Sequence, residues 1–198
     1  MSLLLETIRV IHNSFQNLDY HNFRVNNSRK KLLGTNDSWD LKNIIKLPEL
    51  NSSLIYKCRF IYLEEVISVE FHPYSMKPLK SLTLVDFPDF KYNHKYLERN
   101  KLEALKATNS TTDDILIVQY NKVTDCSYAN IIFDDGNKWI TPSTPLLRGT
   151  KRQLYIDNHI ITEQEVTTAD LKRFSRARII NAMIDLEESP DISIQNIV

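Results

Sequence analysis

Two side chains in this sequence of 198 residues have types and surroundings that suit covalent and acid–base chemistry. Lys95 lies beside aromatic residues in the segment NHKYLER, where partial desolvation could make its amine a nucleophile. Asp125 lies in a polar connection between two apolar stretches, within residues 123–133 (VTDCSYANIIF). A carboxylate in that position could keep a ring nitrogen protonated. Each residue also has a plainer explanation, because exposed lysines and turn-forming aspartates are common.

The third feature is a candidate anion site at Gly149 and Thr150, where a helical pattern over residues 150–156 begins. Free backbone N–H groups, a hydroxyl and the helix dipole at such a start can bind a phosphate. A capped helix whose glycine only permits a bend would have the same sequence. A lysine, an acid and an anion-binding helix start are together the groups that pyridoxal 5′-phosphate (PLP) requires of a protein.

Other polar residues could assist. Arg24 lies on an expected helix with His21 and Ser28 and could supply a cation to an anion. Asn181 and Ala182 follow the last expected strand and could form another turn that binds a phosphate or a substrate carboxylate. A solvated helix face would explain Arg24 equally well.

Lys57 and Arg59 are the candidate substrate-binding residues. They alternate with Cys58 in an expected strand and therefore share one face of it. Two cations on one face could bind an anionic substrate, or could simply face water.

Composition excludes several classes of protein. The 25 Lys and Arg residues balance the 25 Asp and Glu residues, which argues against a nucleic-acid partner or a membrane surface. No apolar run approaches the roughly 20 residues of a membrane span, and the first residues lack the basic flank of a signal peptide. The two cysteines, Cys58 and Cys126, have no metal-ligand spacing. We therefore expect a cytoplasmic protein with free thiols and no metal.

Glycine is scarce, with three residues in the chain, and this excludes the glycine-rich phosphate loops of nucleotide-binding folds. Gly34 follows KKLL and is expected to cap the C-terminus of a helix. Gly136, in the segment DDGN, is expected in a hairpin turn.

The order of the expected elements predicts an α+β fold with two lobes and a cofactor cleft between them. Residues 86–90 (DFPDF) interrupt the pattern and are the expected linker, giving lobes at 1–87 and 88–198, the second carrying Lys95 and the helix start. Strands are expected at 3–10, 54–62, 66–71, 79–85, 115–118, 131–133, 138–140 and 177–183. Helices are expected at 21–33, 39–45 with Ser38 as N-cap, 96–105, 150–156 and 169–174.

Taken in order, the motifs resemble those of the fold-type IV PLP enzymes, which include branched-chain and D-amino acid aminotransferases and aminodeoxychorismate lyase. Residues 5–10 (LETIRV) resemble the opening Phe-Glu-Thr-Ile-Arg strand of that family. Residues 21–28 (HNFRVNNS) resemble its His-x-x-Arg-Leu-x-x-Ser helix, which implies that Arg24 contacts the cofactor phosphate. Residues 124–131 (TDCSYANI) are similar to Thr-Glu-x-Ser-x-x-Asn-hydrophobic, which implies that Asp125 pairs with the pyridine nitrogen.

The resemblance continues through the second half of the chain. Lys95 falls where the family places its Schiff-base lysine. Residues 141–152 (TPSTPLLRGTKR) are similar to Thr-Pro…Leu-x-Gly-Ile-Thr-Arg, the phosphate-binding helix start. In this alignment Lys151 replaces the family threonine and offers an ammonium group, and Asp125 is one methylene shorter than the family glutamate.

Within the family, residues 181–183 (NAM) look more like the lyase than the aminotransferases. The resemblance therefore implies a small-molecule amino substrate and elimination of pyruvate from 4-amino-4-deoxychorismate to give 4-aminobenzoate. An aminotransferase acting on a branched-chain or D-amino acid stays open, as do a protein that keeps the fold without catalysis and an unrelated α+β domain. By the same analogy we expect a homodimer.

Overall fold

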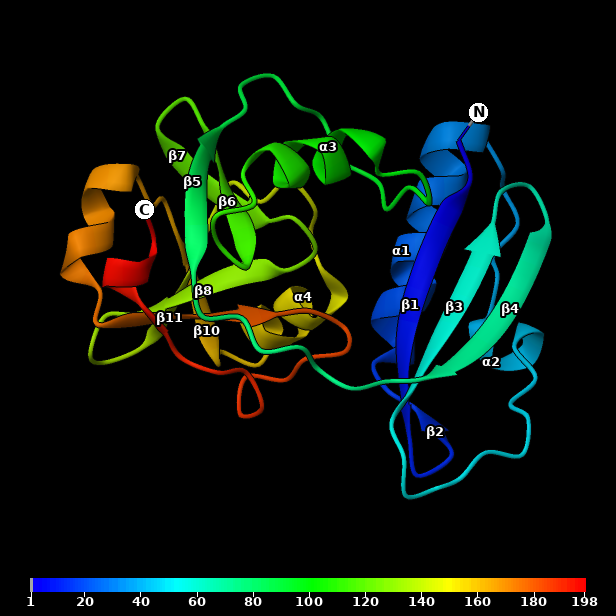
Figure 1. The fold of residues 1–198 in the computed structure, drawn as a ribbon. Helices are drawn as coiled ribbons and strands as arrows, with labels where there is room; N and C mark the ends of the chain where they lie inside the picture. Colours follow the sequence, from blue (N-terminus) through cyan, green and yellow to red (C-terminus); the bar gives the residue numbers. More distant parts are fainter. Residues whose placement is uncertain (1) are drawn as a thin grey trace. The chain divides into compact units, whose positions relative to one another are not determined.

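The computed structural model describes residues 2–198 and has the expected α+β composition (Figure 1). It divides into two compact units. The first comprises Met1–Met76 and His94–Glu98, and the second comprises Lys77–Asn93 and Arg99–Val198. Within residues 2–198, no helix combines the length and the apolar character that crossing a membrane requires.

The first unit is an antiparallel sheet with two helices. Its strands follow the order β2-β1-β3-β4. The strands are β1 (Leu4–Ile11), β2 (Ser14–Phe15), β3 (Tyr56–Tyr62) and β4 (Val66–Pro73), and the helices are α1 (Leu18–Leu33) and α2 (Leu41–Ile44).

The core of this unit lies on one face of the sheet, because side chains alternate along each strand. Ile8 and Val10 of β1 share that face with Phe60 of β3 and pack against the helices, which contribute Val25 and Leu41. Helix α1 ends as expected at Gly34, whose left-handed backbone (φ 69°) lets its N–H bond the carbonyl of Lys30.

The second unit is built on a larger sheet in the order β10-β9-β8-β7-β6-β5, from which β11 and β12 branch beside β8. Its strands are β5 (Leu82–Asp86), β6 (Asp114–Gln119), β7 (Lys122–Cys126), β8 (Asn130–Asp134), β9 (Trp139–Pro142), β10 (Ile161–Gln164), β11 (Arg176–Ile180) and β12 (Ile192–Ser193). Its helices are α3 (Asn100–Thr108), α4 (Thr150–Asp157) and two 3₁₀ turns, Thr168–Arg173 and Ile194–Asn196.

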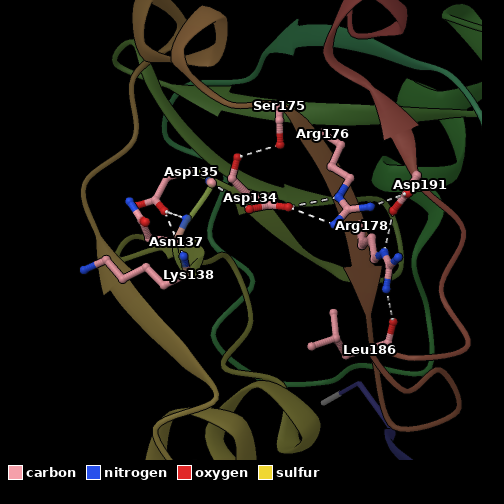
Figure 2. Close-up of polar contacts among 10 residues, drawn as sticks. Asp134, Asp135, Asn137, Lys138, Ser175, Arg176, Arg178, Leu186 and Asp191 are labelled. Atoms are coloured by element: carbon pink, nitrogen blue, oxygen red, sulfur yellow. Dashed lines mark hydrogen bonds and ion pairs between the residues drawn. The ribbon is translucent and has the colours of Figure 1, made fainter.

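An ion-pair network fastens β11 to its neighbours (Figure 2). Arg176 bonds Asp134 at the end of β8 and also Asp191 next to β12. Arg178 bonds the same Asp191 and the carbonyl oxygen of Leu186. The network thus links three segments that lie far apart in the sequence.

Two of the expected helices begin later than predicted. The second helix starts at Leu41, and its N-cap is Asp40, whose carboxylate accepts the N–H of Lys42, so Ser38 as cap was wrong. Helix α3 starts at Asn100, because residues 94–98 pair with β1 instead of forming a helical turn.

The division of the chain also differs from a break at residue 87. The amide of Phe87 bonds Val118 O on β6, and the side chain of Gln119 donates to the carbonyls of Phe87 and Phe90. Residues 86–90 therefore belong to the second unit. The segment with Lys95 belongs to the first unit, because Leu5 N bonds Lys95 O and Leu97 N bonds Leu3 O.

The core of the second unit predicts a large truncation cost at Phe133, which is fully buried on β8 and stacks on Phe174 with ring centroids 4.9 Å apart. Phe133→Ala should lower the free energy of unfolding by about 3–5 kcal/mol, measured by urea denaturation. The matched control is Phe23→Ala on α1, where 73% exposure predicts a change within about 0.5 kcal/mol. Equal losses in the two variants would contradict this assignment of the core.

Candidate active site

A buried cluster in the first unit centres on Glu6. Strand β1 points Glu6 toward α1, where His21 and Arg24 lie three residues apart on one face. Arg24 donates a hydrogen bond to each carboxylate oxygen, from Nε to Oε1 at 2.8 Å and from Nη2 to Oε2 at 2.6 Å. His21 donates from Nδ1 to Oε2 at 2.5 Å. The pair of bonds holds the Arg24 guanidinium in one orientation.

The pKa values of the cluster show which charges it holds. Burial alone would raise the pKa of Glu6, but the charge of Arg24 and the hydrogen bonds from His21 and Arg24 lower it to about 2. Burial lowers the pKa of His21, the Glu6 carboxylate opposes this shift, and the charges of Arg24 and Lys95 lower the pKa further. Glu6 is therefore ionised at neutral pH and His21 is a neutral donor.

Lys95 is held beside this cluster. Its carbonyl is bonded to Leu5 N at 2.9 Å, which fixes its backbone to the start of β1. The preceding residue, His94, bonds the hydroxyl of Ser28 on α1 at 3.0 Å. Lys95 is half-buried, and its charge lies close enough to His21 to lower that pKa. The structure thus brings together Lys95 and Arg24, two residues that the sequence singled out.

Lys57 and Arg59 share the face of β3 opposite the helices, as expected, but their surroundings differ. Arg59 donates to Glu70, its cross-strand neighbour on β4, at 2.8 Å. Lys57 instead lies opposite Arg9 of β1, so two cations face each other across the ladder.

Asp125 is buried in the second unit, where only 5% of it is exposed at the end of β7. Its two oxygens accept hydrogen bonds from Asn130 Nδ2 at 2.8 Å and from Leu147 N at 2.9 Å. Burial raises the pKa of Asp125 to about 6, while these two bonds and the charge of Arg152 limit the rise. Among residues 2–198, both hydrogen-bond donors to this acid are uncharged, so a cation would stabilise it.

Helix α4 begins where the anion site was expected. Gly149 is its N-cap and Thr150 its first residue. The ammonium of Lys151 does not extend from the helix start, because it is ion-paired with Asp185. The ammonium that was expected to stand in for a hydroxyl is thus engaged by Asp185.

Asn181 and Ala182 form a tight turn after β11. The Asn181 side chain accepts the N–H of Met183 at 2.8 Å, and its backbone pairs with Ile184. Its amide also reaches Tyr128 O, in the loop that follows Asp125, at 3.5 Å. The turn therefore belongs to the same group of residues as Asp125.

Sequence reasoning did not assign roles to four further residues of these clusters: Glu6, His21, Asn130 and Arg152. Arg152 is fully buried, and donates from Nη2 to Pro142 O at 2.9 Å and to Glu163. Each of the four lies inside a motif, so its position was visible in the sequence. Its partners were not, since they come from distant strands.

Comparison with known proteins identifies the family. Residues 3–186 match the model of the Amino-transferase class IV family. This chain belongs to the class IV aminotransferases. A relative, an uncharacterized protein of Haemophilus influenzae, is 33% identical over 182 residues, which are 91% of this chain and 97% of the relative.

Solved structures agree with this assignment. A protein of Haemophilus somnus, provisionally named 4-amino-4-deoxychorismate lyase, is 30% identical with a TM-score of 0.87, covering 94% of this chain and 98% of that one. A hypothetical aminotransferase of Mycobacterium tuberculosis in its PLP-bound form shares the fold, with a TM-score of 0.76 at 16% identity over 96% of this chain and 80% of that one.

Class IV aminotransferases are PLP enzymes, and the residues present here fit that cofactor. The second unit offers a buried carboxylate bound only by neutral donors, and a helix start preceded by glycine. The first unit offers an oriented arginine and a half-buried lysine. Acid, anion-binding and amine groups are thus all present. The chain is an enzyme whose cofactor is PLP.

The Glu6 cluster predicts how stability depends on pH. Because the folded-state pKa of Glu6 is depressed to about 2, its contribution is present above the ordinary value of 4.5 and is lost as the pH falls from 4.5 toward 2. Glu6→Gln should lower the free energy of unfolding at pH 7 by about 3–5 kcal/mol, because it breaks the two charged hydrogen bonds to the half-buried Arg24. The difference from wild type should shrink as the pH approaches about 2.

Urea denaturation across this pH range measures the effect, with Glu64→Gln in the exposed β3–β4 turn as the control. A loss that is the same at low and neutral pH would show that the Glu6 charge is not responsible.

Proposed function

We propose that this chain is a PLP-dependent lyase of the 4-amino-4-deoxychorismate type, which releases pyruvate and forms 4-aminobenzoate. The observation that carries the proposal is Asp125, a buried carboxylate whose hydrogen-bond donors are both neutral. Such a group is stabilised by a cationic N–H partner, and a protonated pyridine nitrogen is one. When bound, PLP supplies a ring that withdraws electrons from the substrate.

The remaining cofactor contacts follow from charge and position. Arg24 would bind the phosphate, because Glu6 already fixes the direction of its guanidinium. In the second unit, the backbone N–H groups of Thr150 and Lys151 at the start of α4 would bind an anion, because the helix dipole favours one there. Asn181 and Ala182 would border the substrate through their turn.

Lys95 would act as the amine that holds the cofactor and then moves protons at the reacting carbon. An amine can do both only if it is partly desolvated and is uncharged when it accepts a proton. Lys95 is half-buried and lies close enough to the Glu6 cluster for its charge to act on His21. The neutral state of His21 keeps a further positive charge away from the same place.

Lys57 is the stronger of the two candidates for a substrate carboxylate. Arg59 is already neutralised by Glu70 at 2.8 Å. Among residues 2–198 Lys57 has no ion-pair partner, so its charge is available to a substrate carboxylate. An acidic substrate is therefore favoured, which both a chorismate derivative and an amino acid satisfy.

The lyase is preferred to an aminotransferase because of the Asn181-Ala182 turn and because of the Haemophilus somnus protein, which is alike over nearly its whole length. The aminotransferase alternative is supported by neighbours at lower identity, among them a provisionally named amino-acid aminotransferase of Mesorhizobium loti at 19%. We further propose a cytoplasmic homodimer without a nucleic-acid partner.

The role of Lys95 predicts a loss of both colour and turnover in Lys95→Ala. Wild type incubated with PLP should show a visible absorption band that borohydride removes, leaving the cofactor on the peptide that contains Lys95. Wild type should also release pyruvate from 4-amino-4-deoxychorismate without any amino acceptor, followed with lactate dehydrogenase.

Lys91→Ala, at an exposed position, is the control and should keep both properties. Transfer of an amino group to a keto acid with no pyruvate release would replace the lyase by an aminotransferase. A wild type that binds no PLP would refute the proposal.

The different surroundings of Lys57 and Arg59 predict different kinetic effects. Lys57→Gln should raise KM by about tenfold or more, because a charge-assisted contact to a carboxylate is lost. Arg59→Gln should change KM by less than about threefold, because its charge is already engaged by Glu70. Steady-state kinetics of the two variants measures this contrast, and a larger effect at Arg59 would reverse the assignment.

A further inference from the structure

We infer that Asn130 is a positioning residue that locks the acid Asp125 to the turn before α4, so that two cofactor-binding elements hold one fixed geometry. The inference rests on the proposed function, because it concerns groups assigned there to the ring nitrogen and to the phosphate.

The hydrogen bonds of Asn130 form a closed ring within the second unit. Asp125 and Asn130 face each other as the register pair between β7 and β8. The Asn130 amide donates to Asp125 Oδ1 at 2.8 Å and to Leu147 O at 2.9 Å. Leu147 returns its own N–H to Asp125 Oδ2 at 2.9 Å. Both side chains are only 5% exposed, so water does not compete for these bonds.

The oxygen of the same amide packs against Gly149. A Cβ added at Gly149 would overlap Asn130 Oδ1 and lie 3.3 Å from its Cγ. The backbone of Gly149 does not itself require glycine, since its φ of −67° and ψ of 145° suit any residue. Glycine is therefore needed at this position because Asn130 occupies the space beside it.

This ring of hydrogen bonds around Asn130, called the clamp below, explains how an aspartate can take the place of the family's longer glutamate. Asp has one rotatable bond fewer than Glu, and with both oxygens bonded the carboxylate of Asp125 cannot turn away. Each oxygen still has a second lone pair, so the acid can accept one more donor without breaking the ring. An amide at position 130 supplies N–H donors to Asp125 and Leu147 and also an oxygen that packs against Gly149.

Four variants separate this clamp from general packing. Gly149→Ala and Asn130→Ala are compared singly and together in the cofactor-free protein, with the thermal unfolding midpoint and PLP affinity as readouts. We expect Gly149→Ala alone to weaken PLP binding by about tenfold or more. In the Asn130→Ala background the same change should weaken it by less than about twofold further, because the overlapping oxygen is gone.

The fourth variant, Asn130→Asp, keeps the size of the side chain and replaces its donor by an acceptor. Two carboxylates at this distance cannot both ionise, so the pKa of Asp125, followed by carboxyl ¹³C NMR in the cofactor-free protein, should rise above its wild-type value of about 6. A role in packing alone would not move this titration. Gln153→Glu, an isosteric change on the outer turn of α4, is the matched control and should leave it unchanged.

The results test the clamp and the proposed function separately. Additive effects of Gly149→Ala and Asn130→Ala, or an unchanged Asp125 titration in Asn130→Asp, would overturn the clamp. If wild type binds no PLP, the proposed function fails. The coupling of the two alanine variants in the unfolding midpoint and the shift of the Asp125 titration then still decide whether Asn130 positions the acid.

Discussion

The burial of a carboxylate at Asp125 is the constraint on which the second unit depends. A charge removed from water is costly unless donors or an opposite charge replace the solvent. Here the protein provides two neutral donors and places the guanidinium of Arg152 within electrostatic range. The result is an acid that titrates near pH 6 when alone and is stabilised further by any cationic N–H donor.

Glu6 in the first unit is also a buried carboxylate, but it is stabilised in a different way. It is as deeply buried as Asp125, yet Arg24 and His21 saturate it and bring its pKa to about 2. Because its partners already compensate the charge of Glu6, a ligand would stabilise this carboxylate little further, and its effect is to orient Arg24. The contrast explains why two buried acids, each inside a family motif, have different tasks. Burial alone therefore does not indicate that an acid binds a ligand. The charges of its partners within the protein must also be considered.

Local sequence predicted most elements of the fold, because β-branched and aromatic runs form strands and Gly34 and Gly136 mark an end and a turn. It failed where a distant strand decides the outcome. Residues 96–98 lie in the stretch that was predicted to be helical, but the chain there bonds to β1. Residues 86–90 have the composition of a linker but are tied to β6 through Gln119. Strand β10 was missed, since its pairing with β9 is parallel and leaves most of it exposed.

The candidate site shows the same limit at the level of side chains. Residue types and spacing singled out Lys95, Arg24 and Asp125 as candidates, because these residues fall inside motifs. They could not rank Lys57 over Arg59, since the ranking depends on the cross-strand ion pair of Arg59 with Glu70. Nor could they show that the Lys151 ammonium is turned to Asp185, 34 residues away. The surroundings of Asp125 are likewise set by pairing between strands: the β7–β8 hairpin places the Asn130 amide, five residues away, opposite the acid.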